Sequence, residues 1–386
     1  MSSRHSSSPS RPAVSSRQST PARSDRQRSS SSSPARPSSR DGPRYALGNI
    51  RVVAQDAQSP YTVVPLANTS RTFRFAVYCI TFAINLLQSQ KGRSALIGTG
   101  IEVWSSWNSR SRRGIRLQQD PRRHPELMEQ AVDQFLESIR NDPPNIIVST
   151  RVRGEGKTQR LDWNDYLDGE YTAKYGAIFR LNKTIIDNAV YAADNNHRED
   201  FERFCFLMGL ATAHELVHTF VGYLTGDSGT DTPPRVQFPF IEPSAPTPVS
   251  RAEAGRFWEG KLLGFLVQAW EDPRNPLGDR QAGEMLGLDQ QSRHYALGQG
   301  WMRSWAFLNF AVQPVRSAAR VSLGRGRRTL QDTERRKQLF NANDIPDSVD
   351  KTEFIEYINS LPVHRLPATL VRDIMSMPAH PSRIRA

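Results

Sequence analysis

The amino-acid sequence predicts an α+β fold, with a small mixed sheet and one buried helix, preceded by a disordered basic tail. Three observations support this prediction. A long apolar segment at 196–226 has large side chains that would cover every face of a helix. Short alternating or apolar runs at 146–152 and 177–182 are typical of strands. Residues 1–44, in contrast, lack the apolar side chains that a core requires.

The amino-terminal tail is rich in serine and arginine. Residues 1–44 contain 17 Ser, six Pro and nine Arg against two Asp, and the whole chain carries a formal charge of +12. Such a segment buries too little apolar surface to offset the entropy of ordering, so we expect disorder. Its Ser-Arg dipeptides suggest contact with nucleic acid or an acidic partner, or phosphorylation sites. The lack of interleaved aromatic residues favours a solvated linker instead.

No targeting or membrane-spanning segment is predicted. Met1–Ser10 has no apolar stretch, and the longest apolar run, Phe75–Leu87, is too short to cross a bilayer. Cys79 and Cys205 lie inside apolar runs without a C-x-x-C pattern, which predicts buried free thiols. We therefore expect a soluble intracellular protein, cytoplasmic or nuclear, without membrane contact.

The first half of the chain is expected to alternate extended segments and helices. Residues 45–70 have the composition of extended structure and turns, and Phe73–Gln88 is an apolar helix. Pro125 fits the first turn of a helix that ends at Asp142-Pro143-Pro144, and a strand follows at 146–152. The polar stretch 153–170 is expected to be a loop.

The run Ala177–Asn182 alternates apolar with mostly polar residues, as a half-buried or edge strand does. An ordinary core strand explains it equally well. Asn196, followed three residues later by Glu199, then marks the start of the long apolar helix, and Gly226 marks its end.

That helix carries the motif His-Glu-x-x-His in its centre. His214 and His218 are four residues apart and lie one above the other on a helix, so both can direct a ring nitrogen at one ion about 2 Å away. Glu215 borders such an ion without binding it and can take a proton from the attacking water. Three polar groups in an apolar helix need partners, and a zinc ion satisfies all three. The alternative is that they bond to backbone or to one another.

The motif and its helix resemble the active-site helix of the zincin metallopeptidases. The resemblance is local and covers approximately residues 146–270. Val221 and Leu224 stand where the metzincin branch has Gly and His, so the chain departs from that branch. By resemblance, 177–182 is the strand that would pair with an extended substrate.

In the glutamate-type branch the third zinc ligand is a Glu on a later helix, which implies Glu253. Glu253-Ala254-Gly255 loosely resembles the Glu-Ala-Asp of that branch, with Gly255 in place of the acid. Alternatively, Ser250 and Glu253 form a capping box that needs no metal. Glu259 is the rival ligand. It lies six residues after Glu253, which on a helix is about 240° round the axis, so the two side chains cannot face one ion together. The other acidic candidates are Asp227, Asp231 and Glu242.

The remaining segments complete the expected organisation. Residues 227–249, with six prolines, form an irregular connection, 251–259 a helix and 262–270 a strand, with one more helix near 301–312. The domain prediction is a tail at 1–44, a zincin-like domain at 45–330, and a helical extension at 331–386 with short helices at 352–360 and 368–375.

The resemblance implies a zinc-dependent peptidase that acts on a peptide or protein substrate. His214, His218 and Glu253 would hold one zinc ion and Glu215 would be the general base. Tyr223, His294 and Tyr295 are candidate donors to the oxyanion by side-chain type alone, and nothing in the sequence selects among them. Another class of function remains open, namely an inactive zincin scaffold that contacts nucleic acid or an acidic partner through its tail and the basic cluster 110–116. The third hypothesis is a closed structural zinc site.

Overall fold

The computed structural model describes most of the chain beyond the tail. The described residues are 49–55, 62–106, 117, 119–161, 171–226, 232–233, 235–236, 253–291, 293–313, 316–320, 338–340 and 351–364. The chain divides into two compact units, Met1–Gly42 and Pro43–Ala386. The first unit, and with it the predicted disordered tail, lies outside the described residues, so the fold below is that of the second unit.

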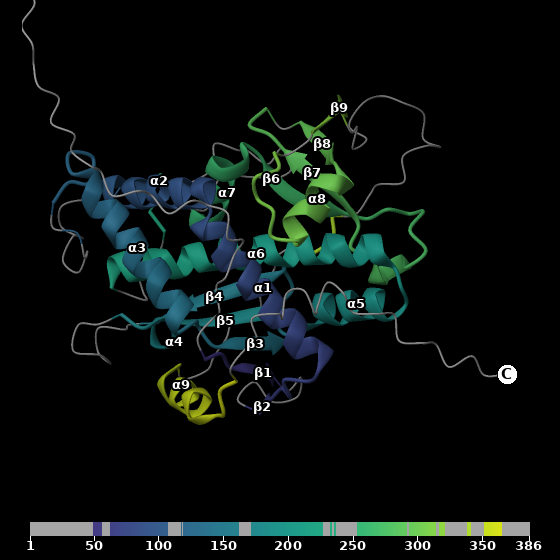
Figure 1. Cartoon of the computed structure of the whole chain (residues 1–386), viewed down its shortest axis with the longest axis horizontal. Helices are drawn as coiled ribbons and strands as arrows, with labels where there is room; N and C mark the ends of the chain where they lie inside the picture. Colours follow the sequence, from purple (N-terminus) through teal and green to yellow (C-terminus); the bar gives the residue numbers. More distant parts are fainter. Residues whose placement is uncertain are drawn as a thin grey trace, which may run out of the picture. The chain divides into compact units, whose positions relative to one another are not determined.

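One sheet of five strands confirms the α+β class. Its strands are β1 (Val52–Gln55), β2 (Val63–Pro65), β3 (Ile146–Ser149), β4 (Gly156–Arg160) and β5 (Ala177–Asn182). Their order is β2-β1-β3-β5-β4, and the three inner strands are parallel while both outer strands are antiparallel to their neighbours (Figure 1). The predicted extended region at 45–70 and the strand beginning at Ile146 are therefore confirmed.

The described part of the chain forms nine α-helices, of which α6 carries the motif. They are α1 (Arg71–Gln88), α2 (Gln90–Ser106), α3 (Pro125–Asn141), α4 (Ala173–Gly176), α5 (Lys183–Asp194), α6 (Arg198–Thr225), α7 (Ala254–Leu263), α8 (Gln299–Ala306) and α9 (Lys351–Ser360). The predicted helices α1 and α3 are confirmed. The expected helix at 301–312 is shorter and earlier, and α2 was not predicted because its glycines and polar residues weaken the helical pattern.

Helix α6 is buried on nearly every face, as its composition predicts. It packs against α1, α5, α7, α8 and β4. Its length and hydropathy would also allow it to cross a bilayer, but 78% of the relevant window is buried inside the protein, as in a core helix. The helix ends at Gly226, which has a φ of 69° and stops the helix as predicted. It starts at Arg198, two residues later than the Asn196 signal indicated.

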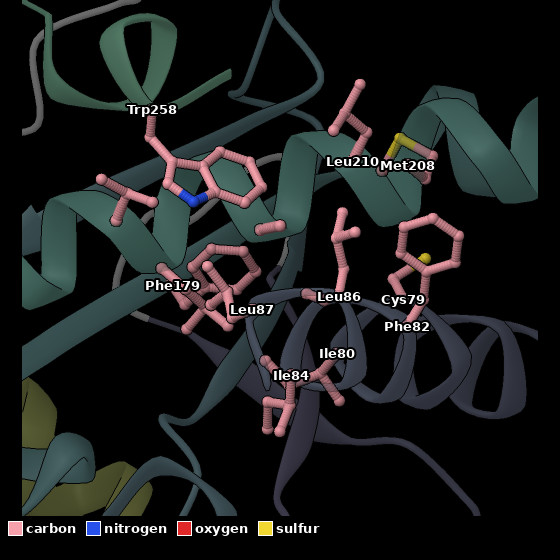
Figure 2. Close-up of a cluster of buried hydrophobic side chains, with 14 of the residues drawn as sticks. Cys79, Ile80, Phe82, Ile84, Leu86, Leu87, Phe179, Met208, Leu210 and Trp258 are labelled. Carbon is pink, nitrogen blue, oxygen red and sulfur yellow. The ribbon is translucent and has the colours of Figure 1, made fainter. Parts of the chain in front are cut away.

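The contact between α1 and α6 forms the centre of the core. Figure 2 shows side chains of α1, among them Phe82 and Leu86, facing α6 across this contact. A Cβ at Gly209 would stand under 3.0 Å from the Phe82 ring, so the glycine is what lets α1 approach this closely. Trp258 of α7 is fully buried beside α6, and its indole N–H donates to the carbonyl oxygen of Gly92 at 3.2 Å.

From Leu266 the chain forms a second sheet, of which the sequence predicted only the first strand. Its antiparallel strands are β6 (Leu266–Trp270), β7 (Glu284–Leu288), β8 (His294–Leu297) and β9 (Arg316–Arg320), in that order. The predicted strand at 262–270 corresponds to β6, although Leu262 and Leu263 still belong to α7.

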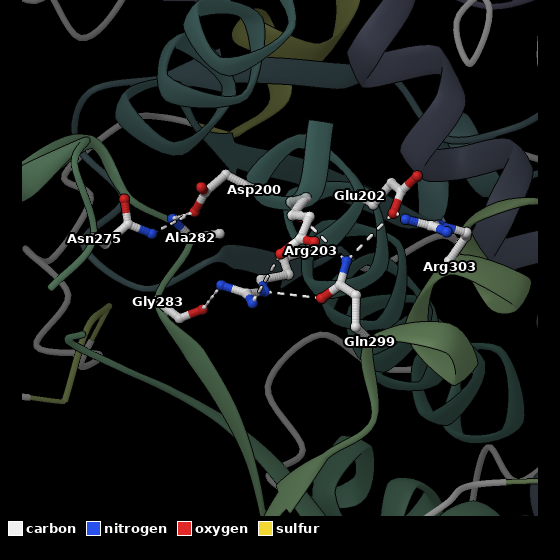
Figure 3. A network of polar contacts seen from close by, with 9 residues as sticks. Asp200, Glu202, Arg203, Asn275, Ala282, Gly283, Gln299 and Arg303 are labelled. Atoms are coloured by element: carbon white, nitrogen blue, oxygen red, sulfur yellow. Dashed lines mark hydrogen bonds and ion pairs between the residues drawn. The ribbon is translucent and has the colours of Figure 1, made fainter. Parts of the chain in front are cut away.

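Polar side chains at the start of α6 connect it to this second sheet and to α8 (Figure 3). The Arg203 guanidinium donates to Gln299 Oε1 at 2.9 Å, and Arg303 forms an ion pair of 2.8 Å with the buried Glu202. Asn275 donates to Asp200 at 2.9 Å. These bonds join one end of α6 to α8 and to the loop between β6 and β7.

The expected loop at 153–170 is wrong in its first part, because Gly156–Arg160 forms β4. The sequence GKTQR lacks the apolar alternation of a strand, and all five residues are only partly buried. Thr158 Oγ1 donates to the carbonyl oxygen of Glu215 at 3.0 Å, which places β4 along the motif helix. Consequently Ala177–Asn182 is an inner strand between β3 and β4, and the edge-strand interpretation of that run is wrong.

Helix α9 covers the other face of the five-stranded sheet and confirms the predicted short helix at 352–360. Its Phe354 and Ile358 pack with Ile147 and Ile178, whereas Phe179 faces the main core. This alternation along β5 shows that both faces of the sheet are covered. The other predicted short helix, 368–375, lies outside the described residues. Cys79 and Cys205 are buried and form no disulfide, as expected.

Candidate metal centre

Helix α6 presents the two motif histidines side by side. The ring centroids of His214 and His218 are 5.3 Å apart, as four-residue spacing on a helix requires. Both side chains are only about one-fifth exposed, on a helix that is otherwise almost fully buried. They therefore face a small opening in the core.

Glu253 meets both histidines from the neighbouring helix. Its Oε1 lies 3.1 Å from His214 Nε2 and is also paired with His218 Nε2. One potential ligand atom from each of the three residues lies within 4.8 Å of the others. Two imidazoles and one carboxylate form a donor set that suits a catalytic zinc ion, which takes three protein ligands. Glu253 is thus the acidic residue that the structure brings to the motif.

The three groups are strongly coupled electrostatically. Burial alone would lower the pKa of His214, but the charge and hydrogen bond of Glu253 outweigh burial and raise it well above the usual value. Burial would likewise raise the pKa of Glu253, yet the two histidines hold it well below its usual range. The Glu253 carboxylate is therefore anionic and the site attracts a cation, for which a proton on His214 and a metal ion compete.

Glu259, the rival ligand, lies on the other side of the His214 ring. Its Oε2 is 3.8 Å from His214 Nδ1, the ring nitrogen that does not face Glu253. Its Oε1 accepts a hydrogen bond from the backbone N–H of Val267, and its side chain is buried. Glu259 therefore lies outside the group that His214, His218 and Glu253 form, at the ring nitrogen where a carboxylate can support a metal-binding imidazole.

Gly255 makes this arrangement sterically feasible. A Cβ at position 255 would stand under 3.0 Å from three atoms of the His214 ring. The sequence alone suggested that the glycine replaced a functional acid. In the structure His214 occupies the space that a side chain at 255 would need, and the carboxylate near its other ring nitrogen belongs to Glu259, one turn later on α7.

The capping-box interpretation made Ser250 the N-cap and placed Glu253 inside the helix. It is wrong about where the helix begins. Helix α7 starts at Ala254, so Glu253 is the N-cap residue itself, and its Oε2 accepts from the backbone N–H of Arg256. Ser250 lies outside the described residues. The cap uses one carboxylate oxygen and leaves Oε1 for the histidines, so capping and metal binding are compatible in one side chain.

Glu215 follows His214 on α6 and lies next to the first residue of β4. A Cβ at Gly156 would stand 3.2 Å from Glu215 Cγ, so the glycine leaves room for the carboxylate arm. Glu215 also lines a pocket of about 110 Å³ that adjoins His214. Its lining residues are Glu155, Gly156, Leu207, Leu210, Ala211, His214, Glu215, Arg256, Glu259, Leu266, Val267, Gln268, Gln338 and Phe340.

Two charged residues of this pocket were not predicted from the sequence. Burial raises the pKa of Glu155 to about 7, although His214 and Arg256 oppose that shift. Arg256, one turn after Glu253 on α7, is exposed at the pocket wall. No sequence motif marks either residue. Only the recognition of 156–160 as a strand along α6 would have placed Glu155 here.

The three candidate oxyanion donors lie outside the pocket lining. Tyr223 is buried and donates to Gln134 Oε1 at 3.2 Å. His294 contacts Gln268 Oε1 at 3.2 Å, and Tyr295 lies under the Arg293 guanidinium. None of the three lines the described pocket, whereas Arg256 does. The other acidic candidates, Asp227, Asp231 and Glu242, and the basic cluster 110–116 lie outside the described residues.

Comparison of the chain with protein-family models, with curated proteins and with solved structures found no match in any of the three.

Proposed function

We propose that this protein is a zinc-dependent peptidase of the zincin class. The observation that carries the proposal is the convergence of His214 Nε2, His218 Nε2 and Glu253 Oε1 on one point, with Glu215 and a pocket next to it. The α+β fold with a buried motif helix supports it. Two His and one Glu are the ligands of one group of catalytic zinc sites.

In this proposal His214, His218 and Glu253 hold the ion, which when bound supplies a Lewis acid and lowers the pKa of water. The Glu215 carboxylate takes a proton from the attacking water and passes it to the leaving amine. Arg256 lies where its guanidinium can stabilise negative charge that develops on the substrate. Glu259 keeps the His214 ring oriented. Strand β4, the outermost strand beside α6, is the candidate for alignment of an extended peptide.

The direct test is metal content together with hydrolysis. We expect purified protein to contain about one zinc per chain and His214→Ala to lose it. A chelator should stop cleavage of a mixed peptide library, and added zinc should restore it. A parent protein that stays metal-free after incubation with zinc would contradict the proposal. The alternative of an inactive binding scaffold depends on basic segments outside the described residues.

The two acidic residues of α7 should differ in their effect on zinc. Glu253→Gln removes a ligand, whereas Glu259→Gln removes only the charge at His214 Nδ1 and keeps an acceptor for Val267. We expect Glu259→Gln to weaken zinc binding about 10- to 100-fold in a chelator-competition titration, with zinc still bound at saturation. Glu253→Gln should lose more. If Glu259→Gln is instead the variant that fails to bind zinc, Glu259 is the ligand and Glu253 is not.

A further inference from the structure

Residues 338–340 lie along the edge of β6. Strand β6 is the outermost strand of the second sheet, and Gln338 forms an antiparallel bridge with Trp270. The backbone N–H of Leu339 donates to the carbonyl oxygen of Ala269 at 2.9 Å. A segment about 70 residues further along the chain thus extends the sheet by one short strand, where β6 passes the pocket.

Leu339 anchors this segment. Its Cδ1 lies 2.7 Å from the point where a Cβ at Gly283 would stand, and the side chain packs against the main core. Gly283 has a φ of 79°, which a residue with a side chain rarely adopts. The close approach and the backbone hydrogen bond together fix the position of residues 338–340 relative to β6.

Phe340 then forms a wall of the pocket. It is half-buried and lines the same pocket as Gln338, His214 and Glu215. Its φ is 58°, in the left-handed region that a bulky residue avoids. Such conformations persist where the surroundings hold them, and they concentrate at functional sites. A conformation that is unfavourable for the backbone places an aromatic ring at the pocket beside the candidate metal centre.

The size of the pocket limits what can enter it. Its volume is about 110 Å³, whereas a cavity of roughly 150 Å³ is known to hold benzene. One wall is apolar, formed by Leu207, Leu210 and Leu266. The space is therefore smaller than a cavity that holds an aromatic ring, and we expect it to admit an aliphatic group more readily than a ring while Phe340 is present.

We propose that Phe340 determines the size specificity of a side-chain subsite next to the metal centre. The subsite takes aliphatic side chains up to about the size of leucine and rejects aromatic ones. That the ligand is a peptide side chain rests on the proposed peptidase function, but the role of Phe340 as the limiting wall does not. Phe340→Gly should enlarge the pocket and also relieve the positive φ, whereas Phe340→Ala enlarges it and keeps the strain.

The first experiment needs no activity. Toluene has the shape of the removed benzyl group, and its binding to zinc-free protein can be followed by ligand-observed NMR. We expect saturable binding to Phe340→Gly and Phe340→Ala, and none to the parent. Phe307→Gly, which removes a phenyl ring that is 46% exposed and outside the pocket, should bind none either. Phe340→Gly should have a higher Tm than Phe340→Ala. Equal toluene binding by parent and both Phe340 variants would overturn the proposal.

The second experiment uses zinc-loaded protein and peptides that differ at one position, as Ala, Val, Leu, Phe or Trp. In the parent, kcat/KM should be highest for the aliphatic residues, and in Phe340→Gly the ratio of Phe to Val should rise at least about tenfold. An unchanged ratio would overturn the specificity role. Toluene binding by the Phe340 variants, without cleavage by any zinc-loaded form, would leave the limiting wall established and contradict the peptidase function alone.

Discussion

Glu215→Gln is expected to abolish peptide hydrolysis while zinc stays bound. The amide has the shape of the carboxylate but cannot take a proton, and the atoms that converge on the candidate ion belong to His214, His218 and Glu253. Loss of a general base typically costs about 10²- to 10⁴-fold in kcat. The measurement is kcat on a cleaved peptide, with zinc content determined on the same sample.

The matched control is Glu137→Gln, the same chemical change at an exposed position of α3 outside the pocket. Its kcat and zinc content should equal those of the parent. The backbone around Glu215 should be intact in the variant, because Thr158 bonds to the carbonyl oxygen and not to the side chain. Full activity of a zinc-loaded Glu215→Gln protein would remove Glu215 from the proposed mechanism.

The long helices could be predicted because a single local signal determines each of them. Helix α6 combines large apolar residues on all faces with a glycine stop, and α3 combines a proline start with an apolar stripe. The histidine pair follows from the geometry of one helix and needs no tertiary information. These parts of the fold and of the candidate site are therefore contained in short stretches of sequence.

The strands around the site could not be predicted because their partners determine them. Gly156–Arg160 has no apolar side chain and begins with a glycine, and neither feature favours a strand. It forms β4 because it pairs with β5 and lies along α6. Once β4 occupies that position, β5 becomes an inner strand. Glu155 and Phe340 reach the pocket from segments almost 200 residues apart in sequence, which no periodicity connects.

The acidic residues of α7 show both the strength and the limit of helical geometry. Six residues on a helix set Glu253 and Glu259 too far round the axis to share one ion, and the structure places them at opposite nitrogens of the His214 ring. Helical geometry alone could not assign the two roles, because it does not determine where α7 begins. That information comes from the N-cap at Glu253, whose second oxygen remains available for the histidines.

Gly255→Ala should disrupt the centre although alanine is normally the better helix residue. In an open helical position this change stabilises a protein by up to about 1 kcal/mol. At position 255 the new methyl group would overlap the His214 ring, so either the ring or α7 must move. Overpacking of this kind costs about 1–3 kcal/mol, which corresponds to about a 5- to 150-fold loss of zinc affinity if the displacement falls on His214. Chelator competition measures that loss.

Gly300→Ala provides the matched control, because it makes the same change in α8 where no atom lies within 4 Å of the new Cβ. It should raise Tm slightly and leave zinc affinity unchanged. Gly255→Ala should lower both, and the loss of affinity should exceed the loss expected from Tm alone, because the clash is with a ligand ring and not with the core. Equal zinc affinity in the parent and Gly255→Ala would show that the His214 ring does not need its present position to bind the ion. The proposal that Glu259 orients this ring through Nδ1 would then fail as well.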